Sequence, residues 1–343
     1  SYKQLLKIAN EQCEEMIFSV QCIKQYGYSN TRNITYGNRC TAGSMWNNYL
    51  PNPHFVESFE TATGEKFNWD NYLPGYSAMK EKERVVFFLR DGLSAAEKER
   101  MAAYGADMNK YLDSGNEARI KKAYESRDPR LQMAVITPYA QYNGASSGIA
   151  HTYTLRWPYR GSDSAEPFDI RTDTNDKFYY LWRKFVPEGL EQTERDTYGL
   201  DIPLIRYAEV LLLKAEALNE WGSTHESEAI RCVNEVRRRA GHVELNNATY
   251  PATKVNGQSD LRERIRNEYY WEIGGEDSMY FHELRWGTWK DKKFDNNRNG
   301  LMQMWGETTY TWYWLGDQCW SWPIPAKEME MNSNLEQNEG WIN

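Results

Sequence analysis

The sequence lacks the features that define several large protein classes. Its five cysteines form no CxxC pair and no zinc-ligand spacing, so neither a zinc site nor a dense disulfide framework is expected. No run of eighteen apolar residues occurs, so no stretch reads as a transmembrane helix. The phosphate-binding, nucleophile-elbow and zinc-protease motifs are missing as well. No short motif therefore assigns the chain a catalytic function.

Positive charge is also scarce. The formal net charge is -8, the isoelectric point is about 5.4, and lysine and arginine are dispersed among acids. Nucleic-acid backbones and anionic membranes attract clustered basic residues, so neither is an expected partner. The five histidines have no metal-ligand spacing. The chain begins at Ser1 without an initiator Met or a leader, and we expect a processed or truncated start.

One stretch imitates half of a calcium-binding loop. In DNNRNG, residues 295–300, the side chains of Asp295, Asn297 and Asn299 supply alternating oxygen atoms. The twelfth position of that loop is Gly306, where calcium binding requires a bidentate acid. We therefore expect a turn here and no cofactor in the chain. A structural calcium ion is the alternative, and its motif is incomplete.

The chain does contain many aromatic side chains set in polar sequence. Fourteen Trp and 24 Tyr accompany a mean hydropathy of -0.82. Two irregular segments, residues 26–80 and 139–173, are rich in Asn, Gly and Tyr and have few periodic apolar residues. Long ordered loops in compact proteins are often functional, and the aromatic content argues against disorder.

Flat rings beside amide and guanidinium groups have the chemistry of sugar recognition. A pyranose offers a C–H face for stacking and a rim of hydroxyls for polar partners. A nucleobase would use similar rings but would also need a basic groove. The expected ligand-binding residues are Trp46, Asn48, Tyr49, Tyr139, Tyr142, Asn143, Tyr153, Trp157, Tyr159 and Arg160. The alternative is that these rings only fix the long loops to the rest of the fold.

Catalysis is a weaker hypothesis. A glycoside hydrolase needs only two carboxyl groups held about 5 to 9 Å apart. Glu57, Glu60 and Asp70 lie in an aromatic-rich segment and would be the first candidates. No motif singles them out, so we expect a protein without catalytic residues.

Helical periodicity dominates the second half of the chain. The first expected helix runs from Pro203 to about Glu220, and the second is capped by a Ser223–Glu226 capping box and has an apolar stripe that ends at Ala240. A third helix starts at Ser259 and reaches Ile273, and a fourth covers roughly residues 277–289. Consecutive helix pairs of this kind resemble tetratricopeptide repeats, although the spacing is not a clean 34 residues. Arg206 lies at the edge of the first apolar stripe, where we expect it to pair with a neighbouring helix.

The first half is expected to hold fewer regular elements. These are a helix over residues 1–12, a strand in 14–23, helices within 94–126, and strands at 131–137 and 177–186. The fold class is therefore mainly α, with tetratricopeptide-like helical hairpins and a loop-rich region that contains a few short strands. We expect a ligand-binding region over residues 1–195 and the helix pairs with a C-terminal segment over 196–343, in one compact unit.

Several stretches resemble the SusD/RagB family of nutrient-binding lipoproteins. IPLIRYAEVLLLKAEALNEWG, followed by AIRCVNEVRRRAG, resembles the third repeat of that family. Further similar stretches occur in the family's order, namely EEMIFSVQ, FVESFETATGEKF, YESRDPRLQMAVI, YLWRKFV and LRERIRNEYYWEI. The end of the chain, WPIPAKEMEMNSNLEQNEGW, is similar to the family's closing segment. The resemblance covers nearly all of this chain.

The resemblance implies a SusD-type α-superhelix and a non-catalytic function. It implies a lipid-anchored protein on the extracellular face of a Bacteroidetes outer membrane, active in starch or polysaccharide utilisation. Such a protein captures a glycan for a SusC-like TonB-dependent transporter. The RagB branch suggests an oligopeptide as the alternative ligand. The family's lipidated cysteine and N-terminal repeats are absent here, so we expect the anchor in a preceding segment.

Overall fold

The computed structural model describes residues 2–42, 44–160, 166–170, 177–191, 194–294 and 300–341. Two compact units are distinguished within the chain. Unit 1 consists of Ser1–Met279 with Met302–Glu307, and unit 2 of Tyr280–Leu301 with Thr308–Asn343. The sequence-based boundary lay at 195/196, whereas unit 1 holds both the loop-rich residues and the main helix pairs.

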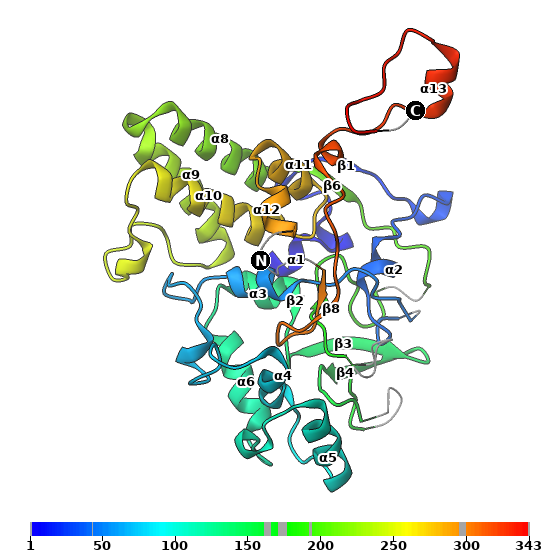
Figure 1. The fold of residues 1–343 in the computed structure, drawn as a ribbon, viewed down its shortest axis with the longest axis vertical. Helices are drawn as coiled ribbons and strands as arrows, with labels where there is room; N and C mark the ends of the chain where they lie inside the picture. Colours follow the sequence, from blue (N-terminus) through cyan, green and yellow to red (C-terminus); the bar gives the residue numbers. More distant parts are fainter. Residues whose placement is uncertain are drawn as a thin grey trace. The chain divides into compact units, whose positions relative to one another are not determined.

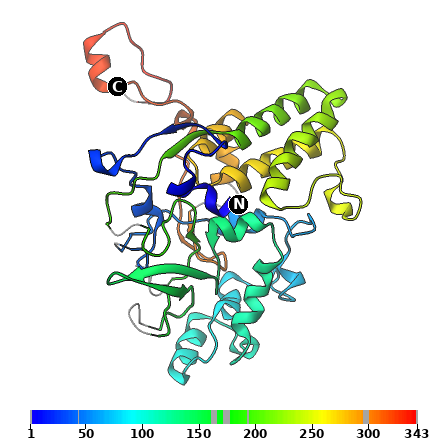
Figure 2. The ribbon, with the colours of Figure 1, turned by 180° about the vertical axis from the view of Figure 1, so that it is seen from behind.

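Three long helices form the helical part of unit 1. They are α8 (Tyr207–Trp221), α9 (Glu226–Ala240) and α10 (Gln258–Ile273), and they lie side by side in both ribbon views (Figures 1 and 2). Helix α8 buries Leu211, Leu212 and the other apolar residues of its inner stripe. Helix α9 ends at Ala240 and α10 ends at Ile273, as the apolar stripes predicted. The mainly α class with tetratricopeptide-like hairpins is confirmed.

The start of the first helix differs from the prediction. Residues Ile202–Arg206 form strand β6, which pairs antiparallel with β1 (Met16–Val20), and α8 begins only at Tyr207. In this two-stranded sheet Pro203 lies on an edge strand, where its missing N–H removes no obligatory sheet hydrogen bond. The strand predicted within 14–23 is confirmed as β1.

The expected strand at 131–137 is wrong over most of its length. Residues Pro129–Ala134 form helix α7, and only Val135–Ile136 extend as strand β2, which pairs with β5 (Leu181–Trp182). The cause is a local helix signal: the Asp128 carboxylate accepts a hydrogen bond from the Arg130 N–H (2.9 Å), and Pro129 occupies the first helical position.

The other α-helices and strands of the described chain are short and are joined by loops and 3-10 turns. In unit 1 they are α1 (Tyr2–Leu5), α2 (Arg32–Tyr36), α3 (Pro53–Ser58), α4 (Glu81–Arg84), α5 (Ala95–Tyr104), α6 (Asn116–Glu125), β3 (Gln141–Ser146) and β4 (Ile149–Thr154). Towards the C-terminus follow α11 (Ser278–Arg285), α12 (Trp289–Phe294), β7 (Leu301–Met302), β8 (Thr308–Tyr310) and α13 (Ala326–Met331). The predicted capping box is not formed, because a 3-10 turn, Ser223–His225, precedes α9.

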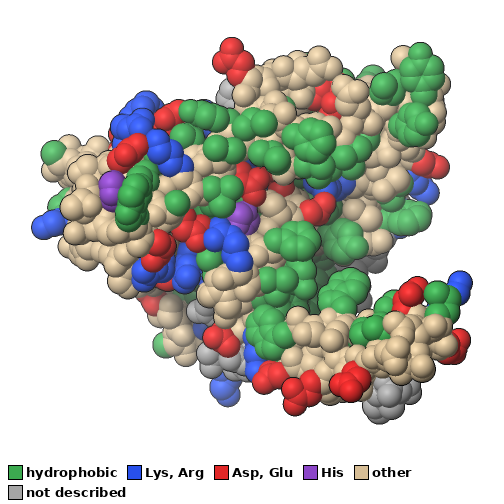
Figure 3. Space-filling view, turned by 90° about the horizontal axis from the view of Figure 1, so that it is seen from above, with side chains coloured by type: hydrophobic (Ala, Val, Ile, Leu, Met, Phe, Trp, Pro, Cys, Tyr) green, Lys and Arg blue, Asp and Glu red, His purple; other side chains and the backbone are tan. Residues whose placement is uncertain are grey.

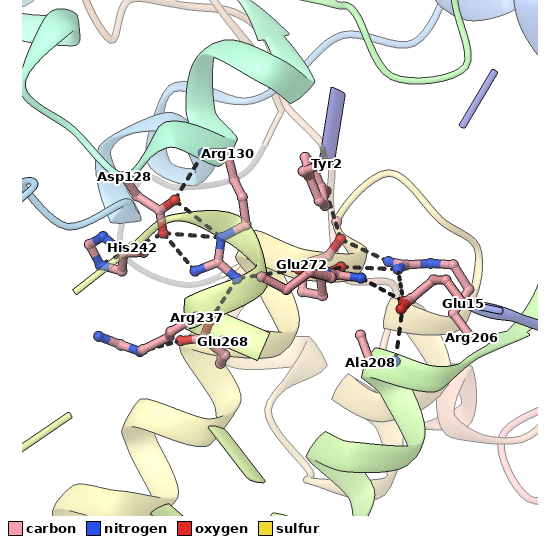
Figure 4. Close-up of polar contacts among 12 residues, drawn as sticks. Tyr2, Glu15, Asp128, Arg130, Arg206, Ala208, Arg237, His242, Glu268 and Glu272 are labelled. Atoms are coloured by element: carbon pink, nitrogen blue, oxygen red, sulfur yellow. Dashed lines mark hydrogen bonds and ion pairs between the residues drawn. The ribbon is translucent and has the colours of Figure 1, made fainter. Parts of the chain in front are cut away.

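A buried ionic network joins α10 to the elements around it (Figure 4). Arg206, the last residue of β6 and the N-cap of α8, contacts the Glu272 carboxylate at 3.0 Å and the Glu276 carboxylate at 2.7 Å. It also contacts Glu15 of the segment before β1 at 2.7 Å. The Arg206 side chain is 1% exposed. The expected pairing of this arginine with a neighbouring helix is confirmed.

Two more buried arginines extend this network. Arg130 of α7 contacts Asp128 at 2.6 Å and Glu268 of α10 at 2.7 Å, and all three side chains are fully buried. Arg237 of α9 contacts Glu268 at 2.9 Å and Glu60 at 3.1 Å. Charges removed from water are costly unless they are paired and hydrogen-bonded. The relative positions of α7, α8, α9 and α10 are therefore coupled through charge as well as apolar packing.

Removal of one partner from this network should be strongly destabilising. In Arg206→Met, Glu272 and Glu276 stay buried with less compensating charge, and we expect the free energy of unfolding to fall by about 3–5 kcal/mol in urea titrations. Arg262→Met is the matched control, because Arg262 pairs with Glu220 at the surface (2.6 and 2.7 Å). Its loss should stay below about 1 kcal/mol. Equal losses would contradict the role of burial.

The network should also make stability depend on acid pH. Burial acts to raise the pKa of Glu276, but Arg206 and Lys184 hold it below its ordinary value. Burial likewise opposes ionisation of Glu272, yet Arg239 and Arg206 lower the pKa of that carboxyl overall. Because these folded-state pKa values lie below the unfolded ones, the stabilisation is present above about pH 4.5 and is lost as pH falls.

We therefore expect the urea midpoint to decrease steadily as the pH is lowered from about 5 towards 2. The Arg206→Met variant should show a shallower decrease, because one of the cations that lowers both carboxyl pKa values is gone. Parallel pH profiles for the two proteins would contradict this assignment.

Candidate ligand-binding surface

The expected site residues between 139 and 160 lie mostly in the core. Tyr139, Tyr142, Tyr153 and Trp157 are all less than 5% exposed. Tyr142 and Tyr153 face each other across the β3–β4 hairpin, where alternate side chains point inward. The hypothesis that these four rings stack on a ligand is therefore corrected: none presents an open face. The alternative, in which rings fix the long loops, applies to this segment.

The polar ends of these rings are satisfied internally. The Tyr139 hydroxyl donates to the Phe88 carbonyl at 2.6 Å, and the Tyr142 hydroxyl donates to the Pro187 carbonyl at 2.6 Å. Burial raises the pKa of both phenols. Trp157 is stacked on Phe178, with 6.1 Å between ring centroids. Buried aromatic residues with satisfied polar groups stabilise the core.

The polar members of the same group differ from the rings. Asn143 lies on the outer face of β3 and is exposed, and Tyr159 is half-buried. Arg160 holds the fully buried Asp169 carboxylate through two contacts of 3.0 Å, and Arg156 contacts the same carboxylate at 2.9 Å. The guanidinium of Arg160 therefore stabilises the loop structure by holding Asp169.

The expected residues near position 46 are accessible. Trp46 is 44% exposed, Tyr49 is 61% exposed, and Asn48 between them is exposed too. These three residues are called the Trp46 surface below. They are close in sequence and lie on one loop segment, so the structure brings this subset of the sequence-based site together.

Backbone hydrogen bonds fix the Trp46 surface against helix α2. The Trp46 N–H donates to the Ile34 carbonyl at 2.9 Å, and the Tyr49 N–H donates to the Thr35 carbonyl at 3.0 Å. Close approach of the two segments is helped by Gly37, because a Cβ there would lie 2.7 Å from Cγ and 2.8 Å from Cβ of Met45, the residue before Trp46. A segment held in this way loses little conformational entropy when a ligand binds.

The ring of Tyr49 is supported from below by Tyr36. The two rings meet edge to face with centroids 6.1 Å apart, and Tyr36 stacks on Trp182 at 5.4 Å. The Tyr36 hydroxyl donates to the Gly275 carbonyl at 2.8 Å, and burial raises the pKa of Tyr36 to about 12. Tyr36 is therefore a neutral, rigid support at ordinary pH.

Polar groups lie close to the Trp46 ring. The Arg195 guanidinium lies 5.9 Å from the ring centroid, and the Asn33 side-chain amide donates to the Arg195 carbonyl at 3.3 Å. Asn33 is fully buried, so the exposed amide at this surface is that of Asn48. An open indole, an exposed phenol ring, this amide and the Arg195 guanidinium together fit a ligand that has one apolar face and a hydroxyl-bearing edge.

Sequence reasoning missed two other groups of exposed rings. Tyr26 and Tyr28, in the YGYSN stretch of unit 1, are 71% and 68% exposed. In unit 2 the exposed aromatic residues include Tyr310, Trp312, Tyr313, Trp320 and Trp322. Figure 3 shows hydrophobic side chains gathered in groups on one face of the molecule. The closely spaced aromatic residues of TYTWYW, residues 309–314, could have predicted the second group from the sequence.

The three candidate catalytic carboxylates have structural partners. Glu57 accepts a hydrogen bond from the Trp69 indole at 2.7 Å, and Asp70 accepts one from the Ser77 N–H at 3.1 Å. Burial acts to raise the pKa of Glu60, but the hydrogen bond from His242 and the charge of Arg237 lower it overall. A glycosidase general acid needs a raised pKa, so Glu60 does not fit that function.

The described residues offer no evident site for a metal ion and no membrane-spanning helix. Within the described residues, no group of three or more His, Cys, Asp or Glu side chains is arranged to hold a metal ion. Five of the six residues of the calcium-like stretch, 295–299, lie outside the described residues. None of the described helices combines the length and apolar character needed to cross a bilayer.

Curated relatives match parts of this chain. The SusD-like protein P38 of Formosa agariphila is 32% identical over 139 residues, which cover 40% of this chain and 24% of that protein. The starch-binding protein SusD of Bacteroides thetaiotaomicron is 28% identical over 161 residues, which cover 47% of this chain and 25% of that protein. The matched segments thus represent about a quarter of each relative.

Solved structures share the fold over almost the whole chain. A SusD-like protein of Bacteroides fragilis aligns with 99% of this chain at a TM-score of 0.60 and 20% identity. A SusD-like carbohydrate-binding protein of the same species aligns with 98% at a TM-score of 0.57 and 21% identity. This chain covers 57% of each of those chains. The family model for SusD proteins matches residues 14–341, and the chain therefore belongs to the SusD family.

Proposed function

We propose that this protein binds a glycan at the cell surface without catalysis and delivers it to a TonB-dependent outer-membrane transporter. The observation that carries the proposal is the Trp46 surface, where an open indole and an open phenol ring flank an exposed amide on a fixed loop segment. Membership of the SusD family and the similarity to a starch-binding relative support a carbohydrate as the ligand. The transporter, the extracellular location and a lipid anchor are inferred from the family alone.

The chemistry of the surface suits weak or moderate affinity. Each ring that stacks on a pyranose contributes about 0.5–1.5 kcal/mol, by analogy with aromatic pairs. Hydroxyl groups exchange water for protein partners at little net gain. The fixed loop keeps the entropic cost of binding low, so a few contacts suffice. Specificity then depends on the spacing of the rings and on the amide and guanidinium groups beside them.

The pKa values of Glu60 and Asp70 are lowered, the first against the effect of burial by the hydrogen bond from His242 and the charge of Arg237, the second by hydrogen bonds from Ser77, which supports a binding function. Each of Glu57, Glu60 and Asp70 is held by another part of the fold. A ligand bound to the Trp46 surface would leave it chemically unchanged. Delivery to a transporter requires that property, because the cargo must remain intact.

Replacing Trp46 with Ala should weaken glycan binding about tenfold, because one stacking face is lost. Calorimetric titration against a panel of neutral oligosaccharides measures the change. Trp46→Phe should recover much of the affinity. Trp221→Ala is the matched control, because Trp221 is 76% exposed on α8 and lies outside the Trp46 surface. Unchanged affinity in Trp46→Ala would remove the proposed site.

A second variant separates binding from folding. Trp157→Ala removes a ring that is 4% exposed, and we expect it to lower the free energy of unfolding by about 3–5 kcal/mol. The Trp46→Ala variant should keep nearly the wild-type melting temperature. Thermal unfolding of both proteins tests the distinction, and a stable Trp157→Ala protein with impaired sugar binding would restore the original hypothesis for that ring.

Prolonged incubation with a glycan that binds should release no reducing ends above the buffer control. The expected result follows from the structural roles of the candidate carboxylates, and a reducing-sugar assay detects even slow turnover. If reducing ends accumulate and Glu57→Gln abolishes the reaction, the protein is a hydrolase. Binding of mixed oligopeptides with no response to any glycan would instead favour peptide capture.

A further inference from the structure

Unit 1 also contains a polar hollow that no residue of the Trp46 surface lines. Its volume is about 420 Å³, and none of the ten sequence-based site residues lines it. The walls come from the end of α6, helix α7, the start of β3 and the residue after β5. Ligand pockets commonly have volumes of roughly 300–1,000 Å³, so this space is large enough for a sugar residue.

One wall residue, Arg127, carries a buried charge that forms no ion pair within the described residues, although the charge of Glu57 acts on it. Its side chain donates to the main-chain oxygens of Val56 and Phe59 at 2.8 and 2.6 Å, and its guanidinium lies 3.6 Å from the Phe67 ring centroid. No carboxylate forms an ion pair with it in the part of the chain that the structure describes, and its Nη1 donates to no atom there. Burial lowers the pKa of Arg127 to about 10, so it remains a cation at neutral pH.

A second guanidinium lines the same hollow. Arg183 contacts Glu188 at 2.9 Å and donates to the Gln141 carbonyl at 2.6 Å, while its buried Nε has no partner within the described residues. The arginine pair therefore keeps two N–H groups unused. Glu188 compensates the charge of Arg183, whereas Arg127 forms no ion pair within the described residues. A buried cation without an ion-pair partner is costly unless an anion compensates it.

The acidic residues of the walls do not provide that compensation. Asp128 is fully buried and is held by Arg130 at 2.6 Å. Glu125 is exposed and pairs with Lys121 at 3.7 Å. The remaining wall includes the exposed amide side chains of Gln132 and Gln141. Amides of this kind can donate to and accept from sugar hydroxyls.

We propose that this hollow binds a uronic acid residue of a glycan, with its carboxylate at Arg127 and Arg183 and its hydroxyls at Gln132 and Gln141. Planar guanidinium groups bind carboxylates through charge-assisted hydrogen bonds, which a neutral hexose does not form. The sugar part of this ligand rests on the proposed glycan-binding function, whereas the requirement for a carboxylate rests on the arginine pair.

The test compares trigalacturonate with maltotriose by calorimetric titration at pH 7 and low salt. Wild-type protein should bind the uronate trisaccharide at least tenfold more tightly. Gln132→Trp, which fills the hollow and keeps both arginines, should abolish that preference. Gln21→Trp is the matched control, because Gln21 is exposed just after β1 and does not line the hollow. Equal affinity for the two sugars in wild-type protein would overturn the proposal.

Further variants and ligands separate the contributions of the carboxylate and of the sugar ring to the binding affinity. Arg183→Gln should lose the uronate preference. It also leaves Glu188 without its partner at 2.9 Å, so it should melt below the wild-type temperature and is titrated only where circular dichroism shows the native fold. Arg127→Gln is a second neutral variant and is checked in the same way, because Arg127 donates to the Val56 and Phe59 carbonyls. Sodium acetate should bind far more weakly than the uronate, and equal binding would overturn the sugar assignment. If wild-type protein binds neutral sugars through Trp46 but shows no preference for the uronate, the uronate site is refuted and the Trp46 surface stands. If wild-type protein binds the uronate, loses it in Gln132→Trp and binds no neutral sugar, the Trp46 surface is refuted and the uronate site stands.

Discussion

The packing of the helices in unit 1 depends on one buried group, the carboxylate of Glu272. It accepts hydrogen bonds from Arg206 and Arg239 and faces Arg130, so one acid on α10 is shared by residues of α7, of α9 and of the start of α8. Apolar packing alone tolerates small shifts between helices. Buried charges tolerate fewer, because each displaced partner leaves an ion without compensation. The network therefore restricts these helices to one arrangement.

The same end of α10 also supports the proposed ligand surface. Lys184 donates to the carbonyls of Glu272 and Gly274 at 3.0 Å, and Tyr36 donates to that of Gly275 at 2.8 Å. Gly275 has a positive φ of 81°, and a Cβ there would lie 2.9 Å from the Trp182 ring, on which Tyr36 stacks. A continuous series of contacts thus runs from the ionic network to the ring beneath Tyr49.

The helices were predictable where periodicity and end signals agreed. The ends of α9 and α10 follow the apolar spacing, whereas Pro203 suggested a helix start and lies in a strand that pairs with residues nearly 190 positions away. The burial of Trp157 could not be read from its polar neighbours, since its partners Phe178 and Trp305 are distant in sequence. Alternation in the β3–β4 hairpin was a usable signal for Tyr142.

Sharing of Glu272 among several arginines limits how this protein can diverge. Loss of that acid alone leaves positive charge uncompensated in the interior, and loss of one arginine alone leaves negative charge uncompensated. Substitutions at these positions are therefore expected to occur together, as coordinated replacements across helices, whereas the exposed rings of the Trp46 surface can change singly. Ligand preference can thus evolve on a helical framework whose interior changes slowly.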